Sequence, residues 1–439
     1  MATAVFNTSI DKPQAPVAVV ARKGTPVMCM WPRAMAPSTI QILKATAPVV
    51  KEHGTAITST MYKTMFSRYP EVKNLFNMSH HRVKTEEGET TSQQTRTLAN
   101  AVIGFAANAD RLGNLTEAVA RIVHKHVSLD IREEHYPIVG ECILFAIKQV
   151  LQDAATSEIM AAWEEGYFFL ADLLIDAENA KRAEIEKQAG GWTGFRELRV
   201  DRKVRESSEV TSFYLTSTDP SVPLVTFEPG QFLCLKFDSL RENTLLRNYS
   251  VSSAPNTSFY RISVKKEARE NVPSGIVSCH LHDVIEESST LMVAPPCGHF
   301  YLQPTTKPLV FLSGGVGITP LLSMLESLVE TRAKSDGPSS RVVFVQYVRT
   351  RDALAFGEHL EKLAGEHEWL DSHTVVGSEG GAFALPQLEE WLPSRDCEFY
   401  FCGPSGFMAS VNKALAHEWA VPATQRHYEY FGPTQDLEQ

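Results

Sequence analysis

The feature that most limits the fold is a change of sequence pattern at Gly190-Gly191-Trp192. Before it, from Ser38 to about Lys187, apolar residues recur three or four positions apart, which predicts amphipathic helices. The helices are expected at 39–50, 55–69, 93–108, 116–127, 135–151 and 157–186, with Ser38 as the N-cap of the first. This part of the chain is therefore expected to be all-α.

Two other patterns follow this boundary. Alternating β-rich runs predict a small antiparallel barrel or sandwich, at 196–204, 209–216, 226–236, 247–252 and 259–266. From Lys307 onward, purely apolar strands alternate with helical stretches, which is typical of a parallel α/β sheet. These strands are Leu309 to Leu312, Val342 to Tyr347 and Phe399 to Phe401. We expect a leader over 1–37, an all-α domain over 38–187, an antiparallel β-domain over 192–303 and an α/β domain over 306–439.

Charge and composition exclude several classes of protein. A formal net charge of -10 at pH 7 would repel phosphate backbones, which argues against nucleic-acid binding. No run of about 18 apolar residues occurs, so stable membrane insertion is not expected. The seven cysteines are scattered without a CxxC pair, as in intracellular proteins with reduced thiols. A small-molecule chemistry remains the expectation.

The first 37 residues show no helical or strand period and hold five prolines, which predicts a disordered leader. Its basic residues Lys12, Arg22, Lys23 and Arg33 face a single acid, Asp11. Such a leader is either a plain tail of a cytoplasmic protein or a transit peptide for the mitochondrial matrix. The scarcity of arginine favours the plain tail and the cytoplasm.

One histidine of the fourth expected helix points into the core. Leu115, Val119, Ile122 and His126 fall on one stripe, because residues eleven apart differ by only about 20° around a helix. His124 is expected off this stripe. Taken alone, a core-facing histidine is more often a hydrogen-bonded core residue than a metal ligand.

Glu178, on the last expected helix, shares the phase of Tyr167, Leu170 and Leu174 and is also expected to face inward. A buried carboxylate without a partner is costly. Two interpretations remain. Glu178 is solvated where the helix frays, or it accepts a hydrogen bond from a metal-bound imidazole and makes that ligand more electron-rich.

These residues belong to a longer series that resembles the globin domain of flavohaemoglobins over about 38–187. The series is Tyr62 in STMYKTMF, Phe76 in NLFNMS, Gln94 four residues before Leu98, His126 ending HKH, Tyr136 in HYPIVG, and Glu178 after AAWEEGY. The resemblance implies haem b with His126 as the proximal iron ligand and Phe76 against the porphyrin. It further implies a distal pocket lined by Tyr62, Gln94 and Leu98, and support of the ligand by Tyr136 and Glu178. Lys125 would meet a haem propionate or the flavin side, or be an exposed lysine.

A second set of motifs resembles the flavin module of ferredoxin reductase-like proteins. The tetrapeptide 247–250 follows a strand-like run, with the sequence PGQF upstream and Gly298 downstream. By this resemblance Arg247 binds the FAD pyrophosphate, Tyr249 stacks near the isoalloxazine and Ser250 hydrogen-bonds the ring. Gln231 and Ser278 are assigned to the same site, and Asn248 replaces a glutamine of the bacterial proteins.

A third set resembles a nicotinamide-coenzyme domain. The stretch 313–320 follows an apolar strand and opens a helix, where backbone N–H groups and the helix dipole favour a pyrophosphate. The implied coenzyme residues are Gly314, Gly315, Gly317, Thr319, Pro320, Cys402, Gly403 and Pro404, with Cys402 beside the nicotinamide. Near the end of the chain, Glu429 and Phe431 are expected to approach the flavin. Arg349 and Arg351 are either a grip for the 2′-phosphate of NADPH or solvated loop charges, and NADH is favoured.

The resemblance as a whole implies a nitric oxide dioxygenase that passes electrons from NADH or NADPH through FAD to haem and converts NO and O2 to nitrate. One alternative is an oxygen-binding or sensing globin whose reductase keeps the iron ferrous. Another is a diaphorase-like reductase with external acceptors. Glu178 and Tyr136 favour the dioxygenase, because oxygen storage does not need them. The small-molecule partners would be NO and O2, and the protein is expected to be a monomer.

Overall fold

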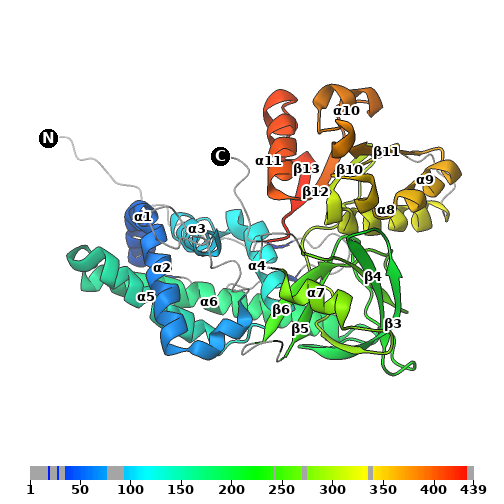
Figure 1. Cartoon of the computed structure of the whole chain (residues 1–439). Coiled ribbons are helices and arrows are strands. Elements are labelled where there is room, and N and C mark those ends of the chain that lie inside the picture. The colour runs from blue at the N-terminus through cyan, green and yellow to red at the C-terminus, as the bar shows by residue number, and fades with distance from the viewer. Residues whose placement is uncertain are drawn as a thin grey trace.

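The computed structural model describes residues 18–19, 27–28, 35–76, 93–238, 240, 244–268, 274–334 and 340–432. Three groups of elements follow one another along the chain (Figure 1), in the order that the sequence predicted. The predicted multidomain class, with an all-α, an antiparallel β and a parallel α/β part, is confirmed. Most of the expected leader lies outside the described residues, within which β1 (Ala18–Val19) and β2 (Val27–Met28) form an antiparallel pair.

The first helix begins two residues earlier than predicted, and the predicted cap at Ser38 is wrong. Helix α1 starts at Pro37, whose fixed φ suits the first helical position, and the N-cap residue Ala36 makes no side-chain cap. Instead, the Ala36 N–H donates to Glu165 Oε1 at 3.1 Å, so the helix start is held by α6. The six helices are α1 (Pro37–Glu52), α2 (Gly54–Arg68), α3 (Gln93–Ala107), α4 (Thr116–Ser128), α5 (His135–Leu151) and α6 (Ser157–Glu186). Short 3-10 turns are η1 (Pro70–Leu75), η3 (Leu112–Leu115) and η4 (Gln152–Ala154).

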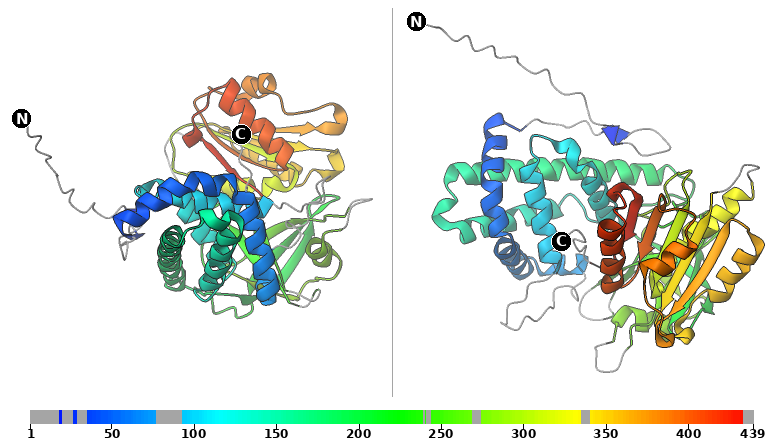
Figure 2. Two further views of the ribbon diagram at one scale, coloured as in Figure 1. Left: turned by 90° about the vertical axis from the view of Figure 1, so that its left-hand side faces the viewer. Right: turned by 90° about the horizontal axis from the view of Figure 1, so that it is seen from above.

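The helices pack by their apolar stripes around one core. Helix α2 lies against α3 and α5, and the long α6 passes α1, α4 and α5 (Figure 2). The side chains of Leu43, Ile57, Met61, Met65 and Ile147 are fully buried there. Spacing of three and four residues therefore predicted both the helices and their buried faces.

The middle part is an antiparallel six-stranded sheet in the order β6-β5-β8-β3-β4-β7. A bridge between Val251 and Ile262 joins its two ends, so the sheet closes into a barrel. The bounds are β3 (Arg196–Arg205), β4 (Val210–Ser217), β5 (Phe232–Phe237), β6 (Leu245–Ser250), β7 (Tyr260–Lys265) and β8 (Thr290–Val293), with α7 (Ile276–Asp283) before β8. Strand β8 was not predicted, and the strand predicted at 226–236 begins only at Phe232.

The last part is a parallel five-stranded sheet in the order β11-β10-β9-β12-β13. Its strands are β9 (Leu309–Gly314), β10 (Val342–Val348), β11 (Leu370–Val376), β12 (Glu398–Cys402) and β13 (Arg426–Glu429). The helices are α8 (Ile318–Arg332), α9 (Gly357–Glu366), α10 (Leu385–Trp391) and α11 (Ser405–Lys413), with short turns η5 (Gly315–Gly317), η6 (Arg351–Ala353), η7 (Gly377–Glu379), η8 (Ala414–Glu418) and η9 (Ala423–Gln425). Neighbouring residues of β9 are buried on opposite faces of the sheet. Phe311 packs with residues of α8 and α9, and Val310 packs with residues of α11, so helices cover both faces.

The chain leaves β9 toward β10 and later returns to the other side of β9 with β12. Ligands of open α/β sheets bind at such a switch point, outside the carboxyl ends of the strands. The fold therefore predicts a ligand site at the carboxyl ends of β9 and β12.

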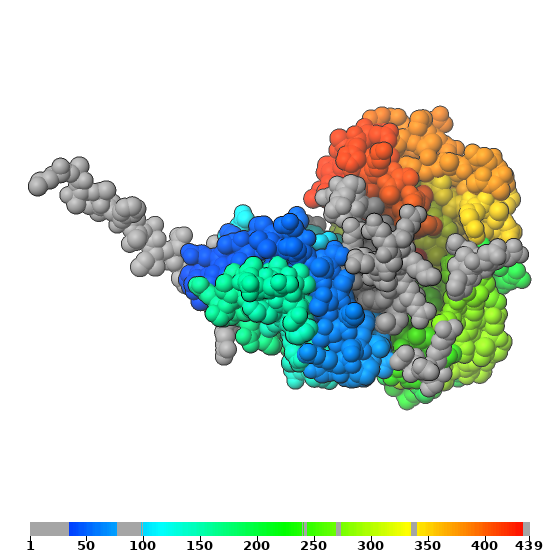
Figure 3. All heavy atoms as spheres, turned by 60° about the vertical axis from the view of Figure 1, so that its left-hand side comes forward, coloured from blue at the N-terminus to red at the C-terminus, as the bar shows by residue number. Residues whose placement is uncertain are grey.

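The helical domain and the barrel share one apolar core. Val123 and Val127 of α4 belong to the same buried cluster as Trp192 and Phe232 of the barrel. In Figure 3 the helical domain (blue to blue-green) and the sheet-containing parts (green to red) form two lobes of the described surface. Across the described ranges, no helix is both long and apolar enough to cross a membrane.

Gly317 tests the packing at the switch point. A Cβ there would lie 2.1 Å from the carbonyl oxygen of Cys402, whereas a Cβ on the exposed Gly406 of α11 would meet nothing within 4 Å. We expect Gly317→Ala to destabilise the α/β domain by about 1–3 kcal/mol. Gly406→Ala, the matched control, should be neutral or stabilise it by up to about 1 kcal/mol. Calorimetric unfolding of both variants measures this, and equal transition temperatures would contradict the close approach.

Candidate functional site

Three helices bring their polar side chains together at one buried carboxylate. Glu178 of α6, 1% exposed, lies with Oε1 2.8 Å from His126 Nδ1 of α4 and accepts a 2.5 Å hydrogen bond from the Tyr136 hydroxyl of α5. The guanidinium of Arg182, one turn further along α6, lies 3.8 Å from Oε2 and balances the charge. Burial and the nearby Glu178 raise the pKa of Tyr136, so its hydroxyl keeps its proton.

This geometry determines the tautomer of His126. A carboxylate can only accept, so Nδ1 carries the proton and Nε2 keeps the lone pair. The His126 side chain is 30% exposed, and among the residues that the structure describes Nε2 has no hydrogen-bond partner. A histidine held in this way is the usual form of a metal ligand.

The side chains around His126 suit a metal whose other ligands come from a prosthetic group. Within the described ranges no group of three or more His, Cys, Asp or Glu side chains could hold a bare ion. A porphyrin iron needs only one axial histidine from the protein, and His126 offers it. The residues present therefore fit a haem.

The residues predicted for the opposite side of the haem fall into one apolar cluster. The Tyr62 ring lies edge-on to Phe76, with centroids 5.6 Å apart, and Leu98 packs against the same core. Burial raises the pKa of Tyr62 and keeps its hydroxyl protonated, as a donor to a bound ligand must be. Gln94 lies in α3, but its side chain is outside the described residues.

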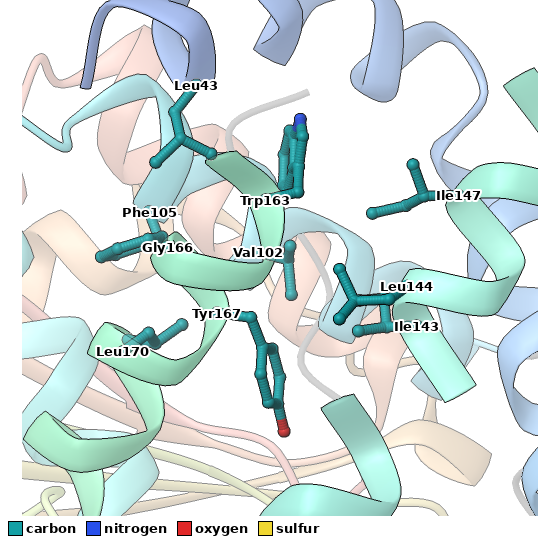
Figure 4. Close-up of a pocket in the computed structure, with 10 residues that line it drawn as sticks. All are labelled: Leu43, Val102, Phe105, Ile143, Leu144, Ile147, Trp163, Gly166, Tyr167 and Leu170. Atoms are coloured by element: carbon teal, nitrogen blue, oxygen red, sulfur yellow. The ribbon is translucent and has the colours of Figure 1, made fainter. Parts of the chain in front are cut away.

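An apolar cavity lies between α1, α3, α5 and α6 of the helical domain (Figure 4). Val102, Ile143, Trp163 and Tyr167 are among its lining residues. The Tyr167 hydroxyl donates a 2.6 Å hydrogen bond to the Tyr136 carbonyl, so one wall of the cavity is connected to the His126 cluster. Such walls suit only small apolar molecules.

Two neighbouring residues at the predicted flavin site, Arg247 and Asn248, keep polar groups that the described part of the chain does not fully pair. The Arg247 guanidinium is half-buried and donates to the Leu246 carbonyl at 2.8 Å, yet no carboxylate pairs with it among the described residues. The surrounding protein lowers the pKa of Arg247, and the neighbouring Asn248 Nδ2 is buried without a hydrogen-bond partner in the described part of the chain. Such groups fit an anionic ligand with a polar edge. Tyr249 is half-buried beside them, and desolvation raises its pKa.

The other predicted flavin residues lie close by but are used differently. Gln231 accepts from the Glu228 N–H and donates to the Gly298 carbonyl at 3.1 Å, so it positions the loop at Gly298. Ser278 donates to the Gly275 carbonyl at the start of α7. Ser250 is buried at the end of β6, opposite Phe232.

The nicotinamide motifs meet at the carboxyl ends of β9 and β12. Gly315 has φ +54°, which favours glycine, and open space where a Cβ would be, so the loop presents bare backbone. A Cβ added to Gly314 would lie 2.9 Å from Pro404 Cδ. A Cβ added to Gly403 would lie 2.9 Å from the Cα of Gly314, so the two loops are in close contact. Thr319 and Pro320 are buried in the first turn of α8, where Thr319 donates to the Val316 carbonyl. The two motifs therefore form one edge that can hold a pyrophosphate.

The three domains meet around Lys125 and Glu429. Lys125 Nζ lies 5.5 Å from the centroid of the Phe232 ring, and Glu429 pairs in register with the buried Cys402. Surrounding protein lowers the pKa of Lys125 and raises that of Glu429 to about 7. Lys125 is nevertheless exposed and Glu429 is half-buried. Phe431 is 48% exposed.

Sequence reasoning missed two residues of this site. His124 was expected off the core stripe, and the structure uses it at the domain junction, where its Nδ1 accepts the Gly298 N–H at 3.1 Å. Desolvation lowers the pKa of His124 to about 3, so the ring stays neutral and can accept. Arg182 follows Glu178 by four residues on one helix, a spacing that could have indicated the pair.

Comparisons with known proteins agree with this arrangement. Residues 59–172 match the Globin family and residues 311–413 the Oxidoreductase NAD-binding domain family. The flavohemoprotein of Oceanobacillus iheyensis is 42% identical, over 91% of this chain and 97% of its own. That of Pseudomonas putida is 43% identical (90% and 98%), and flavohemoprotein A of Dictyostelium discoideum 42% (90% and 98%).

Among solved structures, a flavohemoglobin from Malassezia yamatoensis with bound FAD and heme has the same fold. It matches with a TM-score of 0.76 and 22% identity, over 91% of this chain and all of the other. The family inferred from the sequence motifs is confirmed by the high identity along nearly the whole of each relative. The chain belongs to the flavohaemoprotein family.

Proposed function

We propose that the protein is an NAD(P)H-dependent nitric oxide dioxygenase that converts NO and O2 to nitrate and so removes NO. The observation that carries the proposal is the hydrogen bond between His126 and the buried Glu178, supported by Tyr136 and Arg182. When bound, haem b supplies the iron that takes O2, FAD splits the hydride of NAD(P)H into single electrons, and each electron with one NO and one O2 balances to one nitrate. The domains that hold these groups are 38–187 for haem, 192–303 for FAD and 306–439 for the coenzyme.

The role of Glu178 is electronic. Its negative charge on the Nδ1–H of His126 makes Nε2 a stronger donor, which favours oxygen activation over reversible storage. Tyr136 and Arg182 keep the carboxylate in place and compensate its burial. An oxygen carrier has no need of this group of charges.

Other residues bind the ligands and connect the cofactors. Tyr62, with Gln94 and Leu98, would line the distal side of a bound haem, and Phe76 would pack against the porphyrin. Arg247 would hold the FAD pyrophosphate, and the loop at Gly314 and Gly315 would hold that of the coenzyme. Lys125 of the helical domain and Glu429 of the α/β domain influence each other's pKa, so they lie where these two domains approach, and a flavin bound to the barrel would pass electrons to the haem in this region.

We further propose a monomer in the cytoplasm. The cysteines that the structure describes are all free thiols, as in reducing compartments. Fluorescence microscopy of a C-terminally tagged chain tests the compartment, and a mitochondrial signal would favour the transit-peptide interpretation of the leader.

The function is tested by the products. Holoenzyme in aerated buffer with NAD(P)H should consume NO and form one nitrate per NO, since one electron and one O2 are used for each. An NO electrode and nitrate analysis measure this. Slow NO loss together with reversible O2 binding would favour the oxygen-binding or sensing globin instead.

Glu178→Gln separates the charge of the carboxylate from its hydrogen bond. We expect unchanged haem content but NO-dependent turnover lower by about 10–100-fold, because the imidazole loses its anionic partner. Ferricyanide reduction through the flavin should not change, and Glu184→Gln, on the exposed face of the same helix, is the matched control. Full NO turnover in Glu178→Gln would refute the electronic role.

Arg247→Ala tests the flavin site. Loss of a charge-assisted phosphate contact worth about 1.5–3 kcal/mol should weaken FAD binding by roughly 10–150-fold. The purified variant should be depleted of FAD after gel filtration and keep its haem, whereas Arg199→Ala, an exposed arginine of β3, should keep both. Full FAD occupancy in Arg247→Ala would place the pyrophosphate elsewhere.

A further inference from the structure

The order of strands indicates where the adenosine half of the coenzyme lies. The pyrophosphate loop follows β9, and the expected nicotinamide position lies on the β12 side, by Cys402 and Glu429. Because β10 is the other neighbour of β9, the remaining half of the dinucleotide extends toward the carboxyl end of β10. The ribose that distinguishes NADPH from NADH by its 2′-phosphate therefore lies near residues 349–351.

Two arginines occupy this position. Gly314 pairs in register with Tyr347, so Arg349 stands only two residues beyond the level of the phosphate-binding loop. Arg349 is 65% and Arg351 67% exposed in their side chains, so solvent and ligands can reach both guanidiniums. An arginine after this strand is the feature that accommodates a 2′-phosphate, whereas a carboxylate there binds the ribose diol of NADH.

Each guanidinium already binds an oxyanion. Arg351 Nε and Nη2 donate to the two Glu379 oxygens at 2.8 and 2.7 Å, a fork that a phosphate would match equally well. Arg349 Nη2 donates to Glu209 Oε1 at 2.7 Å. Exposed ion pairs of this kind contribute little, so a phosphate dianion can displace the carboxylates. Glu209 would keep a cation partner, because Lys265 Nζ lies 3.3 Å from its other oxygen.

The acid of the same loop is already hydrogen-bonded. Asp352 accepts hydrogen bonds from Thr350 and Ser208, which hold the pKa of its carboxyl below the usual range. The Ser208 N–H also donates to the Asp352 carbonyl at 2.8 Å, which binds this part of the loop to the barrel. Arg349 and Arg351 are the exposed cations beside it.

We propose that Arg349 and Arg351 bind the 2′-phosphate of NADPH and make NADPH the preferred coenzyme, with Glu379 and Glu209 as the internal anions that the phosphate displaces. The proposal rests on the proposed function, because it concerns the electron donor of that reaction. It reverses the preference for NADH drawn from the sequence.

Steady-state ferricyanide reduction by the holoenzyme tests the proposal without NO. In the wild type kcat/KM should be higher for NADPH than for NADH. Arg349→Ala and Arg351→Ala should each lower kcat/KM for NADPH by about 10-fold or more, through KM, and leave NADH within about two-fold. Arg395→Ala, another exposed ion-paired arginine of the same domain, should change neither value.

Two further measurements test the 2′-phosphate site without relying on the single arginine variants. Glu379→Gln should lower KM for NADPH by up to about five-fold, because the competing charge is gone. Against the wild type, 2′,5′-ADP should inhibit more strongly than 5′-AMP, and the difference should vanish in the double arginine variant. Equal or better use of NADH by the wild type, or equal inhibition by the two nucleotides, would overturn the proposal. NO consumption measured separately with either coenzyme would still decide the proposed function.

Discussion

The buried contact between His126 and Glu178 is the interaction on which the rest of the structure depends. An ionised carboxylate with 1% exposure is tolerable only where charge and hydrogen bonds surround it, and here Tyr136, Arg182 and the imidazole do so from three helices. The contact therefore holds α4, α5 and α6 in register as well as orienting His126. Arg182 also donates to the Ile131 carbonyl, so the turn between α4 and α5 is bound to the same group of charges.

The junction between domains extends this arrangement toward the reductase. The two residues just before His126 contact the barrel: Lys125 lies over Phe232, and His124 accepts from the Gly298 backbone. Gln231 donates to the carbonyl of the same Gly298, so one loop is held both by the barrel and by the haem-bearing helix. Helix α4 would therefore supply both the proposed iron ligand and the contact with the barrel.

Sequence pattern predicted what depends on local period, and missed what depends on distant partners. Spacing of three and four residues predicted all six long helices and the inward phase of His126 and Glu178, because the core selects the apolar stripe of each helix. It could not show that His124, on the opposite side of the helix from that stripe, contacts a loop 174 residues away. Ser38 was expected as a cap from its residue type, but Pro37 and the distant Glu165 determine where α1 begins. The meeting of the Gly314 and Cys402 motifs came from family resemblance, since no local period connects strands so far apart.

The central claim is that the charge of Glu178 strengthens the bond between His126 and the haem iron. Resonance Raman spectroscopy of the ferrous protein measures the iron–Nε2 stretching frequency directly. A clear fall in this frequency is predicted when Glu178 is replaced by glutamine, and no such fall for Tyr136→Phe, which keeps the charge of the carboxylate. The same frequency in the wild type and in Glu178→Gln would contradict the account.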